Sequence, residues 1–182
     1  MNKGVEELIK EGCMQESLYK ALVNKSVQLY FGINTSASPA SYHPESKGIT
    51  FANTESITSA SLKEELFHAW QDAYYPGGIS LYGKDTQGNK SEGYVNIEFE
   101  AKFFKDLLNN PEMYNGCCYA FSNYYDYPKG VYDEYQNWIY GIRDSENISF
   151  QDNDYQRWLK LFQQYDTNYT SPMSNDLSTP DA

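Results

Sequence analysis

Glu64 and His68 stand four residues apart in the stretch SLKEELFHAWQDAYY. Residues four apart on a helix lie on the same face, so a carboxylate and an imidazole at these positions could bind one divalent cation. The helix that must carry them is indicated by four apolar residues at spacings of four, three and four: Leu62, Leu66, Ala69 and Ala73. This pattern predicts an amphipathic helix over 59–75, ended by the Pro-Gly-Gly that follows it.

The rest of the chain predicts a small sheet and several further helices. A helix is expected over about 4–23, with Gly12 as the point where it would break. Strands are expected over 26–33 and 48–52, separated by a polar stretch that extends to about residue 46. Asn96 is the expected N-cap of a helix that continues to about residue 108, and two more helices are expected over about 131–143 and 152–165.

These elements predict an α+β fold in which a small, short-stranded sheet packs beside the helix over 59–75 and the C-terminal half is mainly helical. A chain of 182 residues can bury one sizeable core, so we expect a single domain over 1–166. The Ser-, Thr-, Pro- and Asp-rich tail over 167–182 is expected to be disordered.

Glu64-Glu65-Leu66-Phe67-His68 differs at one position from H-E-x-x-H, the signature of zinc peptidases. A third metal ligand would have to come from another segment, and Glu98 in Glu98-Phe99-Glu100-Ala101 is the candidate. This order of parts resembles the gluzincin branch of the zincin metallopeptidases, and especially the ImmA/IrrE-type small zincins. In that branch a strand precedes an H-E-x-x-H helix, and a later helix bears E-x-x-A. The resemblance covers about residues 49–108, roughly a third of the chain.

The resemblance implies a role for each matching residue. The family's first metal ligand falls on Glu64, its general base on Glu65, its second ligand on His68 and its third ligand on Glu98. This chain departs from the family at Glu64, where the signature has His. The sequence therefore resembles that of a zincin-like protein with a degenerate signature, E-E-x-x-H.

The substitution at position 64 changes the charge of the predicted site. A divalent cation bound by two His and one Glu keeps a net charge of +1, whereas two carboxylates and one His bring the net charge to zero. The pKa of a bound water would then be lowered less, so less hydroxide would form at neutral pH. Carboxylate-rich sites also favour harder ions such as manganese over zinc. The cofactor is therefore zinc or a harder divalent ion, with no metal at all as the alternative.

Ordinary structural roles compete with metal binding at each of these residues. Ser61-x-x-Glu64 is itself a capping-box pattern, although Thr58 or Ser59 could cap an earlier helix start and leave Glu64 in the second turn. Glu64 and His68 could also form a surface pair, and His68 could be a buried structural residue. His43 is expected in a solvated loop, from which it could still approach the site as a hydrogen-bond donor.

Composition restricts the partners. A net charge of −11 argues against nucleic acid, whose phosphates attract clustered Lys and Arg. No apolar run is long enough to cross a membrane, and the N-terminus has no hydrophobic signal segment. A secreted or cell-surface protein trimmed of its signal would have the same sequence, so the compartment stays open. The 18 tyrosines suit a half-wet binding surface.

Two functional hypotheses follow. The first is a divergent zincin-like protein that acts on a peptide or protein, with weakened or altered metal binding, or that has become a pseudoenzyme. The second is a non-catalytic, tyrosine-rich interaction module that binds a glycan or a protein, in which the acidic cluster is only a hydrogen-bond network.

Overall fold

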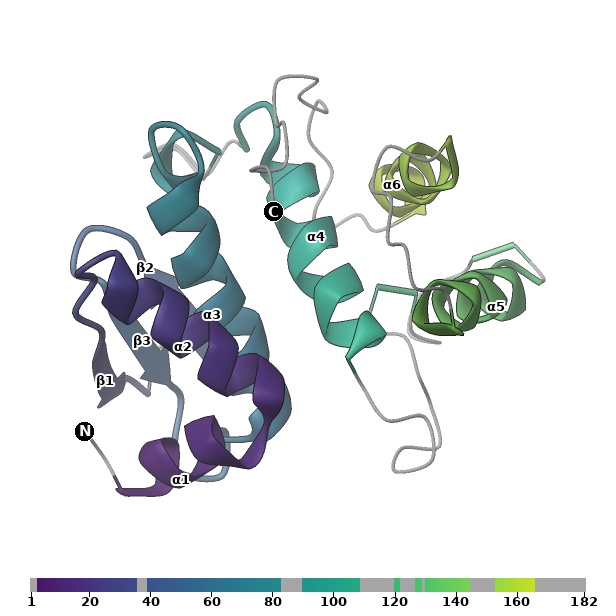
Figure 1. The fold of residues 1–182 in the computed structure, drawn as a ribbon. Helices are drawn as coiled ribbons and strands as arrows, with labels where there is room; N and C mark the ends of the chain where they lie inside the picture. Colours follow the sequence, from purple (N-terminus) through teal and green to yellow (C-terminus); the bar gives the residue numbers. More distant parts are fainter. Residues whose placement is uncertain are drawn as a thin grey trace. The chain divides into compact units, whose positions relative to one another are not determined.

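The chain forms two compact units, Met1–Leu81 and Tyr82–Ala182. The computed structural model describes residues 3–35, 39–82, 90–108, 120–121, 127–128, 130–144 and 153–165. The positions of the two units relative to one another are not determined, so each is a body by itself (Figure 1). The predicted single domain over 1–166 spans both units and stays a prediction, and the predicted tail lies outside the described residues.

The first unit begins with two short helices in place of one long one. They are α1 (Lys3–Glu11) and α2 (Cys13–Asn24), and Gly12 between them has an extended backbone and is the N-cap of α2. A Cβ at Gly12 would lie 2.0 Å from the side-chain oxygen of Gln15. The amide nitrogen of Gln15 donates to the Ser59 hydroxyl at 2.7 Å, and this bond holds the side chain in place. The break predicted at Gly12 is therefore confirmed, and close packing favours glycine there.

Three strands of four residues each form the sheet of the first unit: β1 (Tyr30–Ile33), β2 (Ala40–His43) and β3 (Gly48–Phe51). Their order is β1-β3-β2, with β1 parallel and β2 antiparallel to β3. The registers pair Phe31 with Ile49 and Tyr42 with Ile49. Strand β3 confirms the prediction over 48–52, but the first strand is shorter than predicted. Strand β2 was wrongly expected to be a loop.

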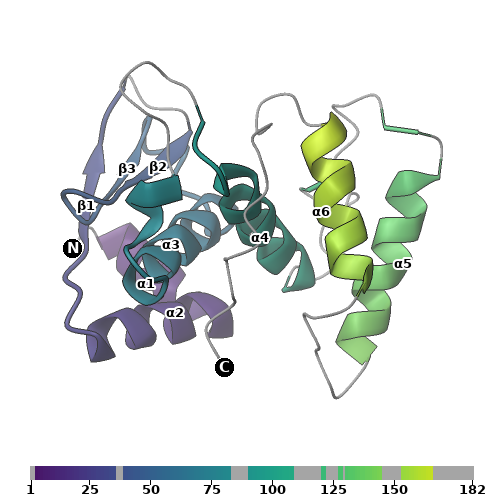
Figure 2. The same cartoon turned by 90° about the horizontal axis from the view of Figure 1, so that it is seen from above.

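Helix α3 (Ser59–Tyr74) follows β3 and packs against β2 and α2, while α1 packs against α2 and α3. Figure 2 shows these three helices on one side of the sheet. Ile49 and Phe51 of β3 are fully buried, as are Leu62 and Leu66 of α3. The apolar stripe predicted from the spacing of these leucines is therefore the face that packs into the core. A short 3-10 helix, η1 (Ile79–Tyr82), comes next in the chain.

The second unit contains three helices: α4 (Tyr94–Leu107), α5 (Val131–Asp144) and α6 (Asn153–Tyr165). Helix α4 packs against both α5 and α6. Its N-cap is Gly93, whose φ of 82° lies in the left-handed region that favours glycine. The prediction that Asn96 is the N-cap is wrong, because Asn96 is buried inside the helix.

Aromatic rings fill the core of the second unit. Phe99 and Phe103 of α4 stack at 5.9 Å between ring centroids, and Phe121 contacts Trp158 and Phe162 of α6 edge to face. Aromatic pairs at such distances stabilise a core beyond the apolar area that they bury. The complete buried cluster is Val95, Phe99, Phe103, Leu107, Ala120, Phe121, Val131, Tyr135, Ile139, Tyr155, Trp158, Leu159 and Phe162.

The described residues therefore form an α+β protein, as the sequence predicts, with six α-helices and a three-stranded mixed sheet. None of the helices in these residues is long and apolar enough to span a membrane.

Candidate metal centre

Thr58 caps the N-terminus of α3, and Ser61 completes the capping box. The Ser61 N–H donates to the Thr58 hydroxyl at 3.1 Å, and the Thr58 N–H donates to the Ser61 hydroxyl at 3.1 Å. These bonds satisfy backbone donors that a helix start leaves unpaired. The alternative capping box between Ser61 and Glu64 is therefore wrong, and Glu64 lies in the second turn of α3.

Glu64 and His68 meet on one face of α3. A carboxylate oxygen of Glu64 and a ring nitrogen of His68 lie within 4.8 Å of each other. Two ligands at bonds of about 2 Å from one tetrahedral ion lie about 3 to 3.5 Å apart, so a small side-chain adjustment brings this pair into bonding range. Glu64 is half-buried and His68 is buried.

Gln71 holds the imidazole of His68 from the next turn of the helix. The Nδ1 atom of His68 lies 2.9 Å from the side-chain oxygen of Gln71, which is fully buried. With this oxygen as the acceptor, Nδ1 carries the proton and Nε2 holds the lone pair. Metal-binding histidines usually donate their second N–H in this way, which fixes the tautomer and the ring orientation. The sequence analysis missed Gln71, although it stands three residues after His68, where a helix places a neighbour.

Glu65 is buried on α3, beside the Glu64 and His68 pair in sequence. It is three residues before His68, so the two side chains share a face of the helix. A buried carboxylate next to a ligand pair is the group that the family resemblance predicts as a general base. The assignment of that role to Glu65 stays a prediction.

Glu98 lies on α4 in the second unit and is half-buried. Its neighbour Glu100 is buried and accepts a hydrogen bond from the Tyr155 hydroxyl at 3.2 Å, so the two acidic side chains of this motif have different surroundings. Glu98 is the residue predicted to join Glu64 and His68 as the third metal ligand. That they converge in space stays a prediction, since Glu98 belongs to the other unit.

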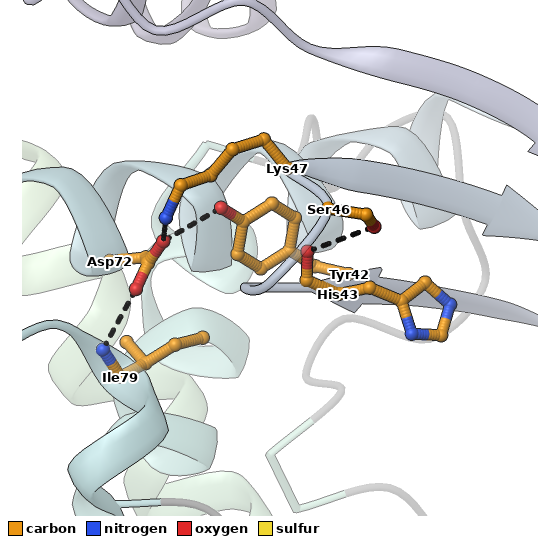
Figure 3. A network of polar contacts seen from close by, with 6 residues as sticks. All are labelled: Tyr42, His43, Ser46, Lys47, Asp72 and Ile79. Atoms are coloured by element: carbon orange, nitrogen blue, oxygen red, sulfur yellow. Dashed lines mark hydrogen bonds and ion pairs between the residues drawn. The ribbon is translucent and has the colours of Figure 1, made fainter.

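Asp72 stands four residues after His68 and anchors the C-terminal half of α3, as Figure 3 shows. Its side chain is 5 % exposed and accepts from Lys47 at 2.5 Å and from the Tyr42 hydroxyl at 2.8 Å. The other carboxylate oxygen accepts from the Ile79 N–H at 3.2 Å. These bonds join α3 to the turn between β2 and β3 and to η1. The sequence analysis did not single out Asp72.

Burial, together with the hydrogen bond to Asp72, raises the pKa of Tyr42. Tyr42 therefore stays protonated and keeps donating to Asp72 at neutral pH. The network has a structural role, because each of its described bonds ends on a side chain or backbone group that holds α3 in place.

His43 lies in β2 and is half-buried, not in a solvated loop as predicted. Its Nε2 atom lies 2.8 Å from the Thr50 hydroxyl of β3, and its backbone oxygen accepts from Ser46 at 3.5 Å (Figure 3). The prediction failed because pairing with β3, rather than the local sequence, makes this segment a strand. A role for His43 as a donor at the site stays a prediction.

Comparisons of the chain with models of protein families, with curated proteins and with solved structures gave no significant match.

Proposed function

We propose that this chain is a divergent zincin-like protein in which Glu64 and His68 of α3 and Glu98 of α4 bind a divalent metal ion. The observation that carries the proposal is the hydrogen bond between His68 and buried Gln71, which places the proton of the imidazole on Nδ1 and its lone pair on Nε2. A structural histidine could make the same bond. The carboxylate of Glu64 beside the ring supplies the second donor that favours a metal.

Each residue has a defined part in this proposal. Glu64 and Glu98 supply charge, His68 supplies a neutral donor held by Gln71, and Glu65 accepts a proton from water if the site is active. A bound divalent ion supplies Lewis acidity. Two carboxylates cancel the ion's charge and weaken that acidity, so we expect little or no hydrolysis of generic peptides. We also expect this site to favour manganese over zinc more than a site with two His and one Glu does.

The first test measures metal content and affinity. The purified protein is analysed by inductively coupled plasma mass spectrometry and then, stripped with chelator, titrated with zinc and manganese by calorimetry. Glu64→His restores the ligand set of active zincins and should raise zinc affinity tenfold or more, about 1.4 kcal/mol. Equal zinc affinities of the two proteins would mean that position 64 does not face a metal.

The second test separates a ligand from a nearby surface charge. Glu98→Gln should lower metal affinity at least tenfold, because it replaces a charged ligand by a neutral amide. Glu92→Gln removes an exposed carboxylate six residues earlier and serves as the matched control. Unchanged metal affinity in Glu98→Gln would mean that only residues of α3 bind the metal, and it would contradict the proposal of three ligands.

The third test addresses the hydrogen bond between His68 and Gln71. Gln71→Leu removes the acceptor at His68 and should lower metal affinity by about tenfold or more, as loss of a partner to a metal-binding histidine typically does. Gln71→Glu keeps an acceptor and should restore most of the affinity. A drop in stability with no change in affinity would show that the bond between His68 and Gln71 is only structural.

One observation favours the alternative, a binding module. Phe67, Trp70 and Tyr74 stack along α3 with ring centroids 5.5 and 4.9 Å apart, and the Lys25 ammonium lies 4.6 Å from the Tyr74 ring. Phe67 is buried, and the half-buried rings of Trp70 and Tyr74 beside it suit a sugar or a protein surface. Trp70→Ala should abolish binding to a glycan array if this module is the function, and should leave metal affinity unchanged.

A further inference from the structure

Strand β1 is an edge strand among the residues that the structure describes. The N–H group of Tyr30 donates to the backbone oxygen of Lys47, just before β3, at 3.1 Å, and that of Asn34 donates to the backbone oxygen of Phe51 in β3 at 2.8 Å. Backbone groups alternate in direction along a strand, so the N–H and C=O groups of Phe31 and Ile33 point away from β3. The outer edge of β1 therefore presents donors and acceptors at the spacing that an added strand needs.

Exposed apolar side chains lie on β1 and on α2. Four large hydrophobic residues are exposed in the described part of the chain: Tyr30 and Ile33 of β1, at 59 and 50 %, Val23 of α2, at 52 %, and Leu108. A hollow of about 680 Å³ lies beside β1, lined by Tyr19 and Val23 of α2, by the segment that follows α2, and by Tyr30 and Phe31 of β1. An exposed edge strand beside a hollow of mixed polar and apolar lining is a surface that a partner would cover.

The charge of this region is opposite to that of the chain. Although Asp and Glu make up 25 of the 182 residues, none occurs from residue 17 to residue 44. Lys20 and Lys25 lie in this stretch, on α2 and at its C-cap, next in sequence to residues that line the hollow. Lys20 forms an ion pair with Glu16 at 2.7 Å, so Lys25 supplies most of the net positive charge of this region. A weakly basic region on a protein of net charge −11 attracts a negatively charged partner.

We propose that the edge of β1 binds an extended, acidic peptide segment of another protein, which adds to the sheet as a fourth strand. Its backbone pairs with Phe31 and Ile33, its apolar side chains enter the hollow beside Tyr19 and Val23, and its acidic residues lie near Lys20 and Lys25. Backbone pairing supplies affinity in this mode of recognition, while the hollow and the lysines select the sequence. The proposal does not depend on the metal centre.

The experiment uses the full chain in chelator and two synthetic peptides. Both have the core Val-Thr-Val-Thr-Val; one is flanked on each side by two aspartates and the other by two lysines. Amide hydrogen exchange followed by NMR should slow at least fivefold at Phe31 and Ile33 when the acidic peptide binds. Exchange at Tyr30 and Asn34 should change little, because their N–H groups already donate to β3. The basic peptide should bind at least tenfold more weakly.

Two variants sharpen the test. The double variant Lys20→Gln, Lys25→Gln should bind the acidic peptide at least fivefold more weakly. Lys160→Gln changes an exposed lysine of the second unit and is the matched control. Ile33→Pro removes one N–H group that points away from β3 and breaks no bond to β3, so it should lower the affinity for both peptides. The charge variants leave the strand unchanged and remain informative if Ile33→Pro does not fold.

Three outcomes would overturn the proposal. The first is equal affinity for the two peptides, and the second is slowed exchange only at amides other than Phe31 and Ile33. The third is dimerisation of the chain without peptide that Ile33→Pro abolishes, measured by sedimentation, since the occupant of the edge would then be a second copy.

Discussion

Each unit contains a hydrogen bond from a tyrosine hydroxyl to an aspartate, and the two pairs differ in their surroundings. Tyr42 donates to Asp72 at 2.8 Å in the first unit, and Tyr135 donates to Asp106 at 3.1 Å in the second. Asp72 also accepts from Lys47, whose side chain is 45 % exposed, so solvent reaches one side of that network. Tyr135 and Asp106 are both fully buried.

The buried pair ties a loop to two helices. Asp106 of α4 accepts from the Ala120 N–H at 3.0 Å as well as from Tyr135 of α5, and Arg143 of α5 donates to the backbone oxygens of Asp106 and Leu107. A buried carboxylate with such partners is explained by structure alone. Burial of an acidic group therefore does not by itself indicate a functional site. The metal proposal depends instead on how His68 is held beside Glu64.

The largest effect is expected at the fully buried pair. Asp106→Ala leaves the Tyr135 hydroxyl and the Ala120 N–H without this acceptor in a core that excludes water, so we expect the free energy of unfolding to fall by about 3 kcal/mol or more. Urea unfolding followed by far-ultraviolet circular dichroism measures the loss. Asp106→Asn keeps an acceptor and should cost less; equal losses in both variants would show that the charge, not the acceptor, is what matters.

A smaller effect is expected at Asp72. Asp72→Ala should lower the free energy of unfolding by about 1 to 2 kcal/mol, because the freed Lys47 and Tyr42 groups are near solvent and can bond to water instead. The same urea experiment measures it. A loss equal to that of Asp106→Ala would mean that the two pairs are buried to the same degree, and the comparison would fail.

Alkaline pH should reveal what the two pairs share, which is a buried tyrosine beside a carboxylate. Burial, with Asp106 beside it, raises the pKa of Tyr135, and burial, with Asp72 beside it, raises that of Tyr42. A tyrosine whose pKa is higher in the folded state contributes stability that is present below its unfolded pKa of about 10 and is lost as pH rises above it. The stability of the wild type should therefore fall more steeply from pH 9 to 11 than that of Tyr135→Phe or of Tyr42→Phe, because both tyrosines stay protonated in the folded protein over this range. Parallel pH profiles would contradict this.

The smallest effect concerns the backbone at Lys47, whose φ of 52° lies in the left-handed region. Lys47→Gly relieves that strain but loses the ion pair with Asp72, so the net change in stability should be within about 0.5 kcal/mol. Lys47→Ala loses the ion pair without relieving the strain and should be about 1 kcal/mol less stable than Lys47→Gly. Equal stabilities of the two variants would show that the conformation at position 47 carries no cost.

The sequence predicted elements whose signals are local. The spacing of Leu62, Leu66 and Ala69 placed α3 to within one residue, and Gly12 marked the break between α1 and α2. It missed β2, because a polar four-residue segment becomes a strand only through pairing with β3. It also placed the N-cap of α4 at Asn96, because Asn is a good capping residue. The actual N-cap is Gly93, whose left-handed backbone cannot be predicted from the spacing of apolar residues.

At the candidate site, too, the sequence predicted the residues that local spacing brings together and missed those that the fold brings together. Glu64 and His68 were found because four-residue spacing is visible in the sequence, and the structure places their ligand atoms close together. The partners that hold this region, Gln71 and Asp72, stand three and four residues after His68 and could have been sought by the same helical rule. Lys47 could not have been found this way, because the turn that brings it to Asp72 depends on the fold of the sheet.

The placement of the three tryptophans gives the two units different optical properties. Trp138 and Trp158 lie in the second unit with ring centroids 5.9 Å apart, whereas Trp70 of the first unit stacks on Tyr74. Two indoles this close couple their electronic transitions, which produces a paired signal in near-ultraviolet circular dichroism. Trp70 carries the indole emission of the first unit. Replacing it by phenylalanine would leave indole emission from the second unit alone, so the loosening of one unit could be followed separately from that of the other.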